Sequence, residues 1–284
     1  MRTFIADKNA KLSKYLLAAY DGGLSFSALN KLFRKRDVKV NGVRTAKDIQ
    51  IYRGDKIEVY YDGEKPDVRF KLLFEDDNVY IVAKPKGVTS EETFLSLSGK
   101  VSPLYFCHRL DRNTDGVMIF AKSERAFEEI KRAFKERTFE KYYRAVVYGA
   151  FGKEKDVLNA YLKKDAERGV VKVSDKYTEG ALPIKTGYRV IFYDKSKNAS
   201  LIEVTLFTGR THQIRAHLAS VGHFVIGDGK YGDERINRAL KAKTLMLTSS
   251  KTVLHFCEGD ALYYLDGKFF EFENELINEF MYAG

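Results

Sequence analysis

The stretch CHRLDRNTDGVMIFAKS, residues 107–123, sets a cluster of charged side chains directly before an apolar run. The run from Val117 to Ala121 is typical of a buried strand. The segment before it, HRLDRNTD, holds one histidine, two arginines and two aspartates in eight residues. An aspartate buried against such a strand stays ionised only if a cation compensates for the water it has lost. An ionised, partly desolvated carboxylate can act as a nucleophile or a base, so the stretch predicts a reactive site at the edge of a core strand.

Strands and helices follow one another around this stretch without regular alternation. Phe127, Ile130 and Phe134 recur at helical spacing, which predicts an amphipathic helix that begins at Ser123. Gly222 is expected to end a second helix in THQIRAHLASVG. Strands are expected at LLF, VYIVA, EKYYRAVVYG, IKTGYRVIFY and SLIEVTLF. This order predicts an α+β fold with a mixed, largely antiparallel sheet.

A smaller α+β unit is expected at the N-terminus. Apolar residues at helical spacing predict two helices, which Gly22-Gly23 separates. Asn41-Gly42 is typical of a hairpin turn between two short strands, and another strand is expected at IEVYY. The polar segment DGEKPDVR then reads as a linker. We therefore expect domains at residues 1–62 and 70–284, joined by a linker at 63–69.

The charge of the chain favours an anionic partner. Lys and Arg outnumber Asp and Glu by 49 to 39, which gives a formal net charge of +10. The segment from Lys31 to Lys47 is especially basic, and positions three and four apart share a helix face. A solvated helix face beside a small hairpin is the alternative to nucleic-acid binding. The candidate RNA-binding residues in this segment are Lys31, Arg34, Lys35, Arg36, Lys39 and Arg44.

Several protein classes are disfavoured by the sequence. No apolar run approaches the ~20 residues that span a bilayer, so no membrane association is expected. The charged N-terminal segment does not suit a secretory signal. Cys107 and Cys257 fit free thiols in a reducing cytoplasm. We therefore expect a cytoplasmic protein, and a monomer.

Three motifs resemble those of a known enzyme family. HRLDRNTDGVMIFAKS resembles the active-site motif of the RluA-type pseudouridine synthases, and EKYYRAVVYG and LFTGRTHQIRAHLASVGHFVIGDGKYG resemble the other two motifs in the same order. KLFRKRDVKVNG and GDKIEV resemble the alpha-L RNA-binding module. The resemblance spans roughly residues 11 to 250. It implies an isomerase with the pseudouridine synthase fold that acts on uridines of structured RNA, most often ribosomal RNA, with transfer RNA also possible.

The resemblance also implies roles for individual residues. Asp111 would be the catalytic aspartate, Tyr143 the motif tyrosine, and Arg215 the ion-pair partner of Asp111. Arg109 would help hold the RNA where the target base leaves its helix, and Arg210 and His212 would support the site or contact phosphate. Asp111 would attack either the sugar or the uracil ring of a flipped-out uridine. No cofactor and no metal are implied.

Some features depart from the family pattern and leave alternatives open. Asp115 stands where the family usually has serine, and an inward-pointing carboxylate there would disfavour the charged form of its neighbour. The stretch beyond Lys251 follows the pattern poorly. A non-catalytic RNA-binding or ribosome-assembly protein on the same fold is therefore the main alternative. A metal-dependent hydrolase is the weaker alternative. His108, Asp111 and Asp115 could form part of a metal site, but no further acidic or histidine motif in the sequence completes it.

Overall fold

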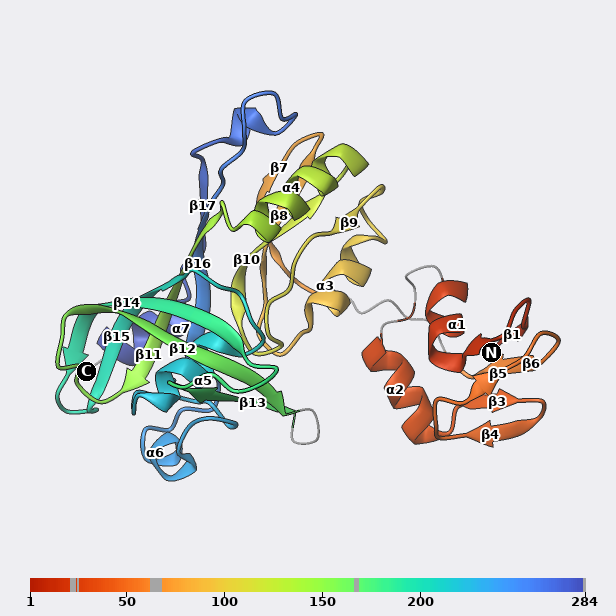
Figure 1. Cartoon of the computed structure of the whole chain (residues 1–284), viewed down its shortest axis with the longest axis horizontal. Helices are drawn as coiled ribbons and strands as arrows, with labels where there is room; N and C mark the ends of the chain where they lie inside the picture. The colour runs from red at the N-terminus through yellow and green to blue at the C-terminus, as the bar shows by residue number, and fades with distance from the viewer. Residues whose placement is uncertain (21–23, 25, 62–67, 166–168, 283–284) are drawn as a thin grey trace. The chain divides into compact units, whose positions relative to one another are not determined.

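The computed structural model describes all residues except 21–23, 25, 62–67, 166–168 and 283–284 (Figure 1). The chain divides into two compact units. The N-terminal unit comprises residues 1–68 and 91–102, and the large unit comprises residues 69–90 and 103–284. The Gly22-Gly23 break and most of the expected linker lie outside the described residues. Val68, at the end of that linker, is buried and donates its backbone N–H to Ser96 Oγ at 3.1 Å.

The N-terminal unit is a small α+β structure, as the sequence predicts. Its sheet has the strand order β1-β6-β3-β4, and the helices pack their apolar residues with this sheet into one core. Asn41 and Gly42 both have positive φ angles, 50° and 81°, as a two-residue hairpin turn requires. The elements are β1 (Arg2–Ile5), β2 (Ala10–Lys11), α1 (Leu12–Ala19), α2 (Phe26–Lys35), β3 (Val38–Val40), β4 (Val43–Thr45), β5 (Gln50–Ile51), β6 (Lys56–Val59) and most of α3 (Ser90–Leu97).

The large unit is built on one extended sheet. Among the described residues it has eleven strands, in the order β13-β12-β14-β15-β11-β16-β10-β8-β7, with β17 paired to β16 and β9 to β10. The strands are β7 (Lys71–Glu75), β8 (Val79–Lys84), β9 (Tyr105–Phe106), β10 (Asp115–Ala121), β11 (Glu140–Tyr148), β12 (Lys155–Asp165), β13 (Val170–Ser174), β14 (Leu182–Asp194), β15 (Ala199–Leu206), β16 (Leu247–Val253) and β17 (Phe269–Glu271).

The pairing pattern of this sheet confirms the predicted mixed, largely antiparallel topology. Within the described strands, every pair is antiparallel except β10 with β16. That parallel junction is short, because only Asp115 with Thr248 and Gly116 with Ser249 face each other across it. All seven residues of β10 are buried, which confirms that the apolar run in the opening motif is a core strand.

Helices cover parts of this sheet. Helix α4 (Glu124–Glu136) lies against β10 and begins where expected, since Ser123 Oγ accepts from the Ala126 N–H at 3.2 Å (Figure 1). Helix α5 (Gln213–Ser220) packs against β12, β13 and β14. The unit also holds α6 (Glu234–Ala239) and α7 (Glu275–Tyr282). Over the described part of the chain, the helices are too short or too polar to cross a membrane.

Candidate active site

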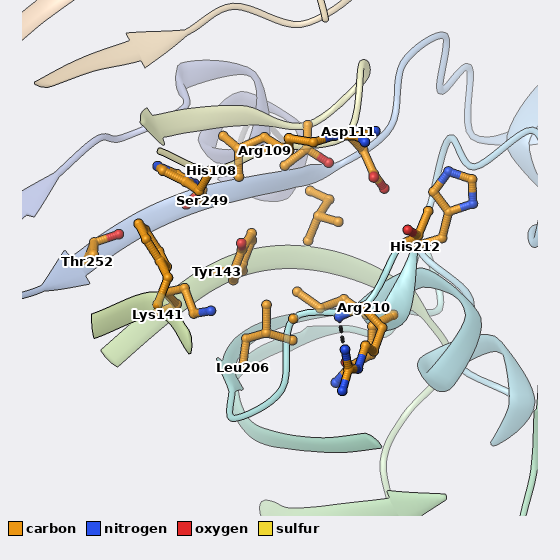
Figure 2. Close-up of a pocket in the computed structure, with 18 of the residues that line it drawn as sticks. His108, Arg109, Asp111, Lys141, Tyr143, Leu206, Arg210, His212, Ser249 and Thr252 are labelled. Carbon is orange, nitrogen blue, oxygen red and sulfur yellow. Dashed lines mark hydrogen bonds between the residues drawn. The ribbon is translucent and has the colours of Figure 1, made fainter. Parts of the chain in front are cut away.

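A cavity of about 730 Å³ opens in the large unit beside the end of β10 (Figure 2). Its lining comes from the loop before β10, from α4, β11 and β16, and from the start of α5. The site residues that the sequence predicts in this part of the chain all line this cavity. They are Arg109, Asp111, Tyr143, Arg210, His212 and Arg215.

Asp111 is held at the edge of the cavity by the turn that leads into β10. The Thr114 N–H donates to the Asp111 carbonyl at 3.0 Å, and the preceding Leu110 N–H donates to Ser90 Oγ at 2.8 Å. The Asp111 carboxylate keeps 25% of its side-chain surface exposed. Arg215 Nη1 lies 3.3 Å from Asp111 Oδ2, so the expected ion pair is present. A fixed backbone and an accessible carboxylate suit a group that has to meet a substrate.

Arg215 is itself fixed by a second carboxylate, which the sequence did not indicate. Its Nε and Nη2 donate to Asp228 Oδ2 and Oδ1, each at 2.7 Å, in a bidentate pair. Burial acts to lower the pKa of Arg215, but the hydrogen bonds and charge of Asp228 outweigh it and raise that pKa. The Lys230 and Tyr231 N–H groups also donate to Asp228. The guanidinium is therefore held charged, with one edge left for Asp111.

Tyr143 supplies an aromatic group to the cavity from the middle of β11. Only 7% of the residue is exposed, and it faces Ser249 on the adjacent strand β16. Burial raises the pKa of Tyr143 to about 12, although a hydrogen bond with Ser249 acts in the opposite direction. The phenol is therefore neutral near pH 7 and can donate a hydrogen bond or stack on a planar ring.

The charges around the cavity suit a polyanion. Asp111 is the one carboxylate among the described residues that line it, against six Lys and Arg side chains. Three of these cations are among the site residues that the sequence predicts, and Lys135, Arg137 and Lys141 are not. Lys141 is two positions before Tyr143 on β11, so both side chains emerge on one face of the strand. Burial, and secondarily the charge of Arg137, lowers the pKa of Lys141.

Comparison with known proteins agrees with this geometry. The family model described as RNA pseudouridylate synthase matches residues 78–220, which include Asp111, Tyr143 and Arg215. The chain belongs to the RNA pseudouridine synthases. It is therefore an isomerase that acts on uridine in RNA.

Individual relatives cover most of the chain. Ribosomal large subunit pseudouridine synthase C of Vibrio cholerae is 30% identical in an alignment of 237 residues that covers 74% of this chain and 73% of the relative. An uncharacterized RNA pseudouridine synthase of Aquifex aeolicus is 29% identical in an alignment of 255 residues that covers 80% of this chain and 78% of the relative. The solved structure of human RNA pseudouridylate synthase domain containing 4 has the same fold, with a TM-score of 0.60 and 19% identity over 74% of this chain and 91% of that one.

Asp115, the departure from the family pattern, is buried in this synthase beside the cavity and not in its lining, as far as the described residues go. Its Oδ1 accepts from Thr248 Oγ1 at 2.6 Å and lies 3.6 Å from Lys86 Nζ. Its Oδ2 accepts from Asn274 Nδ2. The carboxylate is thus engaged by its own hydrogen-bond partners, turned away from the pocket that Asp111 faces.

The geometry does not favour a metal site. His108 is half-buried in the cavity wall, its Nε2 accepts from the Ile119 N–H at 2.9 Å, and its ring lies 4.5 Å from that of Phe134. Desolvation lowers the pKa of His108 to about 3, so the ring is neutral near pH 7 and its Nε2 is already engaged by the backbone. In the described ranges of the chain, His, Cys, Asp and Glu side chains nowhere gather in a group of three that would suit a metal ion.

The basic residues predicted near the N-terminus belong to the other unit. Lys31, Arg34 and Lys35 are exposed on α2, as their spacing predicts. Lys39 and Arg44 face each other across the β3–β4 pair, and each cation lies 5.1 Å from the centre of the Tyr60 ring. Arg36 follows α2 with a φ of 57°. This cluster is therefore a cationic surface of the N-terminal unit.

Proposed function

We propose that this synthase isomerises specific uridines in structured RNA, above all ribosomal RNA, with Asp111 as the nucleophile. The arrangement around Asp111 carries the proposal. Asp111 is an accessible carboxylate in a cation-rich cavity, where it pairs with the buried Arg215 and lies near the neutral Tyr143. A nucleophile of this kind requires both the neighbouring cation that Arg215 supplies and the exposure that a structural aspartate would lack.

The choice of ribosomal RNA rests on relatives and on charge. The Vibrio cholerae relative is named for the large ribosomal subunit. The formal net charge of +10 and the cations around the cavity suit a long polyanion. Such a substrate would place the enzyme in the cytoplasm. We propose separately that the enzyme acts as a monomer.

The proposed reaction needs only the chain and the RNA. The target uridine leaves its helix, because its reacting atoms are inaccessible inside a stack. Asp111 attacks the sugar carbon C1′ or the uracil ring, and the bond between C1′ and N1 breaks. The ring turns, C5 bonds to C1′, and the bond to Asp111 breaks, which regenerates the carboxylate; C5 then loses its proton and N1 gains one. Tyr143 stacks on the ring and donates a hydrogen bond, because a phenol with a pKa of about 12 is a poor source of phenolate near pH 7.

Two groups of residues, most of them cationic, would hold the RNA. Arg109, Arg210 and His212 line the cavity and would contact the flipped nucleotide and its phosphates. The N-terminal unit, as an alpha-L type module, would contact phosphates elsewhere through Lys31, Arg34, Lys35, Arg36, Lys39 and Arg44. Phosphate contacts supply affinity and salt dependence, whereas the cavity selects the base.

The test is a map of pseudouridine across total RNA from three strains, namely wild type, a deletion of this synthase, and a strain carrying Asp111→Asn. Sites missing from both altered strains would support the proposal and identify the substrate. Sites confined to transfer RNA would overturn the ribosomal assignment. Full modification in the Asp111→Asn strain would overturn the role of Asp111. Purified Asp111→Asn should still bind the RNA, because its cations are unchanged.

A further inference from the structure

The proposed catalytic residues stand on opposite sides of a junction in the sheet that only two residue pairs form. Asp111 leads into β10, whereas Tyr143 belongs to β11, and β16 lies between these strands. Six residue pairs join β11 to β16, and six join β10 to β8. Only Asp115–Thr248 and Gly116–Ser249, which we call the seam, join β10 to β16. Along the path of described strands, the separation of Asp111 from Tyr143 therefore depends on these two pairs.

The backbones approach closely at the seam. A Cβ atom at Gly116 would lie 2.1 Å from the Ser249 carbonyl oxygen, and Gly116 has a φ of 110°. Only glycine fits this position. Ser249 in turn faces Tyr143 on its other side. A shift at the seam would thus move Tyr143 and its strand relative to β10.

Buried and half-buried side chains bridge the seam. Asp115 of β10 accepts from Thr248 of β16 at 2.6 Å. Lys86, which follows β8, lies 3.6 Å from Asp115 and donates to the Leu245 carbonyl just before β16. Asn274, which precedes α7, donates to Asp115 and to Thr248, the latter at 3.1 Å. We call Asp115, Thr248, Lys86 and Asn274 the clamp.

Asn274 connects the clamp to the C-terminal helix. Its Oδ1 accepts from the Leu276 and Ile277 N–H groups, at 2.9 and 3.3 Å, so the same side chain caps α7. Each end of this one amide thus has a separate task. Its NH₂ group bridges the two strands of the seam, while its oxygen anchors α7.

We infer that Asp115 and Asn274 are positioning residues for the isomerase, which fix Asp111 relative to Tyr143 by clamping the seam. The inference rests on the proposed roles of Asp111 and Tyr143. A carboxylate at position 115 suits this task because its two oxygens reach partners on three different segments at once and carry the charge that faces Lys86, whereas a serine hydroxyl has one oxygen and no charge. The C-terminal segment from Asn274 on then helps to position the catalytic residues, although none of its described residues lines the cavity.

The decisive variant is Asn274→Asp. Aspartate keeps the cap of α7, but it sets a carboxylate oxygen against Asp115 in place of the bridging NH₂ group. We expect the single-turnover rate on RNA that carries a mapped uridine to fall by roughly tenfold to a hundredfold, as for a small misplacement of reacting groups. The RNA dissociation constant should stay within about twofold, because no lining cation changes.

Rescue and a matched control separate positioning from stability. In the double variant Asp115→Asn with Asn274→Asp, an amide NH₂ group again faces a carboxylate across the seam, and a single negative charge again lies near Lys86. Most of the lost rate should therefore return. Ile277→Ala removes a buried side chain of α7 but leaves the four clamp side chains, and the backbone N–H of residue 277, unchanged. It should lower the melting temperature at least as much as Asn274→Asp while retaining nearly wild-type rate.

Either of two results would overturn the inference. One is a wild-type rate for Asn274→Asp, and the other is an equal loss of rate in Ile277→Ala at equal loss of stability. Asp111→Asn, assayed on the same RNA, keeps these results distinct from failure of the proposed function. Full activity of that variant would overturn the role of Asp111 itself, whatever the clamp variants do.

Discussion

Arg215 gives its shortest hydrogen bonds to Asp228 and only a longer one to Asp111. The two bonds to Asp228 are 2.7 Å long, and the contact with Asp111 is 3.3 Å. Asp228 thus fixes the guanidinium of Arg215. The guanidinium places a positive charge beside Asp111 but does not bind its carboxylate tightly. This suits a carboxylate that has to leave its partner in order to bond to a substrate.

Replacing Asp228 by asparagine should therefore harm both stability and catalysis. The change leaves the buried Arg215 with Asp111 as its remaining carboxylate. We expect the free energy of unfolding in urea to fall by about 3 to 5 kcal/mol, the typical cost of removing one partner of a buried pair. Glu234→Gln, which removes an exposed partner of Arg238, is the control and should change little. Equal unfolding free energies for the two variants would contradict the assignment of Asp228 as the residue that fixes Arg215.

The same pair predicts how stability depends on acid. Burial acts to raise the pKa of Asp228, but hydrogen bonds from Arg215 outweigh it, and the pKa is lowered. A carboxyl with a lowered folded pKa adds stability that is fully present above its unfolded value of ~3.9 and is lost as the pH falls through the folded value. The gap in unfolding free energy between wild type and Asp228→Asn should hold from pH 7 to about 5 and narrow below about 4. A gap independent of pH would contradict this account.

Tyr143 should act in its neutral form. Because burial raises its pKa to about 12, the phenol stays protonated throughout the usual assay range. The single-turnover rates of wild type and Tyr143→Phe should therefore keep a constant ratio between pH 7 and about 10. If phenolate were the base, the wild-type rate would rise about tenfold per pH unit and the phenylalanine variant would not follow. Tyr143→Ala, which also removes the ring, should lose far more rate than Tyr143→Phe.

Lys141 offers a test of the cationic lining of the cavity. In the part of the chain that the structure describes, neither Lys141 nor Arg137 forms an ion pair with a carboxylate. In Figure 2, Lys141 lies on the opposite side of Tyr143 from Asp111. Lys141→Gln should weaken binding of the mapped RNA and reduce the slope of log K against log salt by about 0.7. Lys131→Gln, on the exposed face of α4, should leave that slope unchanged.

Much of the fold could be predicted because its signals are local. The periodicity of Phe127, Ile130 and Phe134 predicted α4, and the all-apolar run before it predicted β10. Strands β12 and β13 were not predicted, because stretches such as LNAYLKKD do not alternate cleanly. Strand β12 is fixed by pairing with β14, β13 by pairing with β12, and both by packing against α5, which are tertiary effects.

The site was predictable to the extent that its residues stand in motifs. Asp111, Tyr143 and Arg215 each carried such a signal. Asp228 was present in the motif VIGDGKYG, where a buried acid in a glycine turn could have suggested a partner for Arg215. Asn274 had no local signal, because its role depends on contacts with Asp115 and Thr248, more than 20 positions away in the chain.

Arg36 provides the last prediction, for the N-terminal unit. Its φ of 57° lies in the left-handed region, which disfavours side chains and favours glycine. Arg36→Gly should therefore leave the free energy of unfolding unchanged or raise it by up to ~1 kcal/mol. Arg36→Ala should not raise it, because alanine keeps a side chain in the left-handed region. Stability can thus be separated from RNA binding in a triple variant with Arg34→Ala, Lys35→Ala and Arg36→Gly. We expect its melting temperature to match wild type, its RNA affinity to fall, and its salt slope to flatten.

A charge-matched control makes this test specific. Lys71, Lys131 and Lys268 are exposed in the large unit and do not line the cavity. Replacing all three by alanine removes the same net charge, so a long-range effect of charge alone would weaken RNA binding equally in both triple variants. A larger loss in the N-terminal variant would assign phosphate contacts to α2 and its following turn. Equal losses would show that this surface acts only through the overall field of the protein.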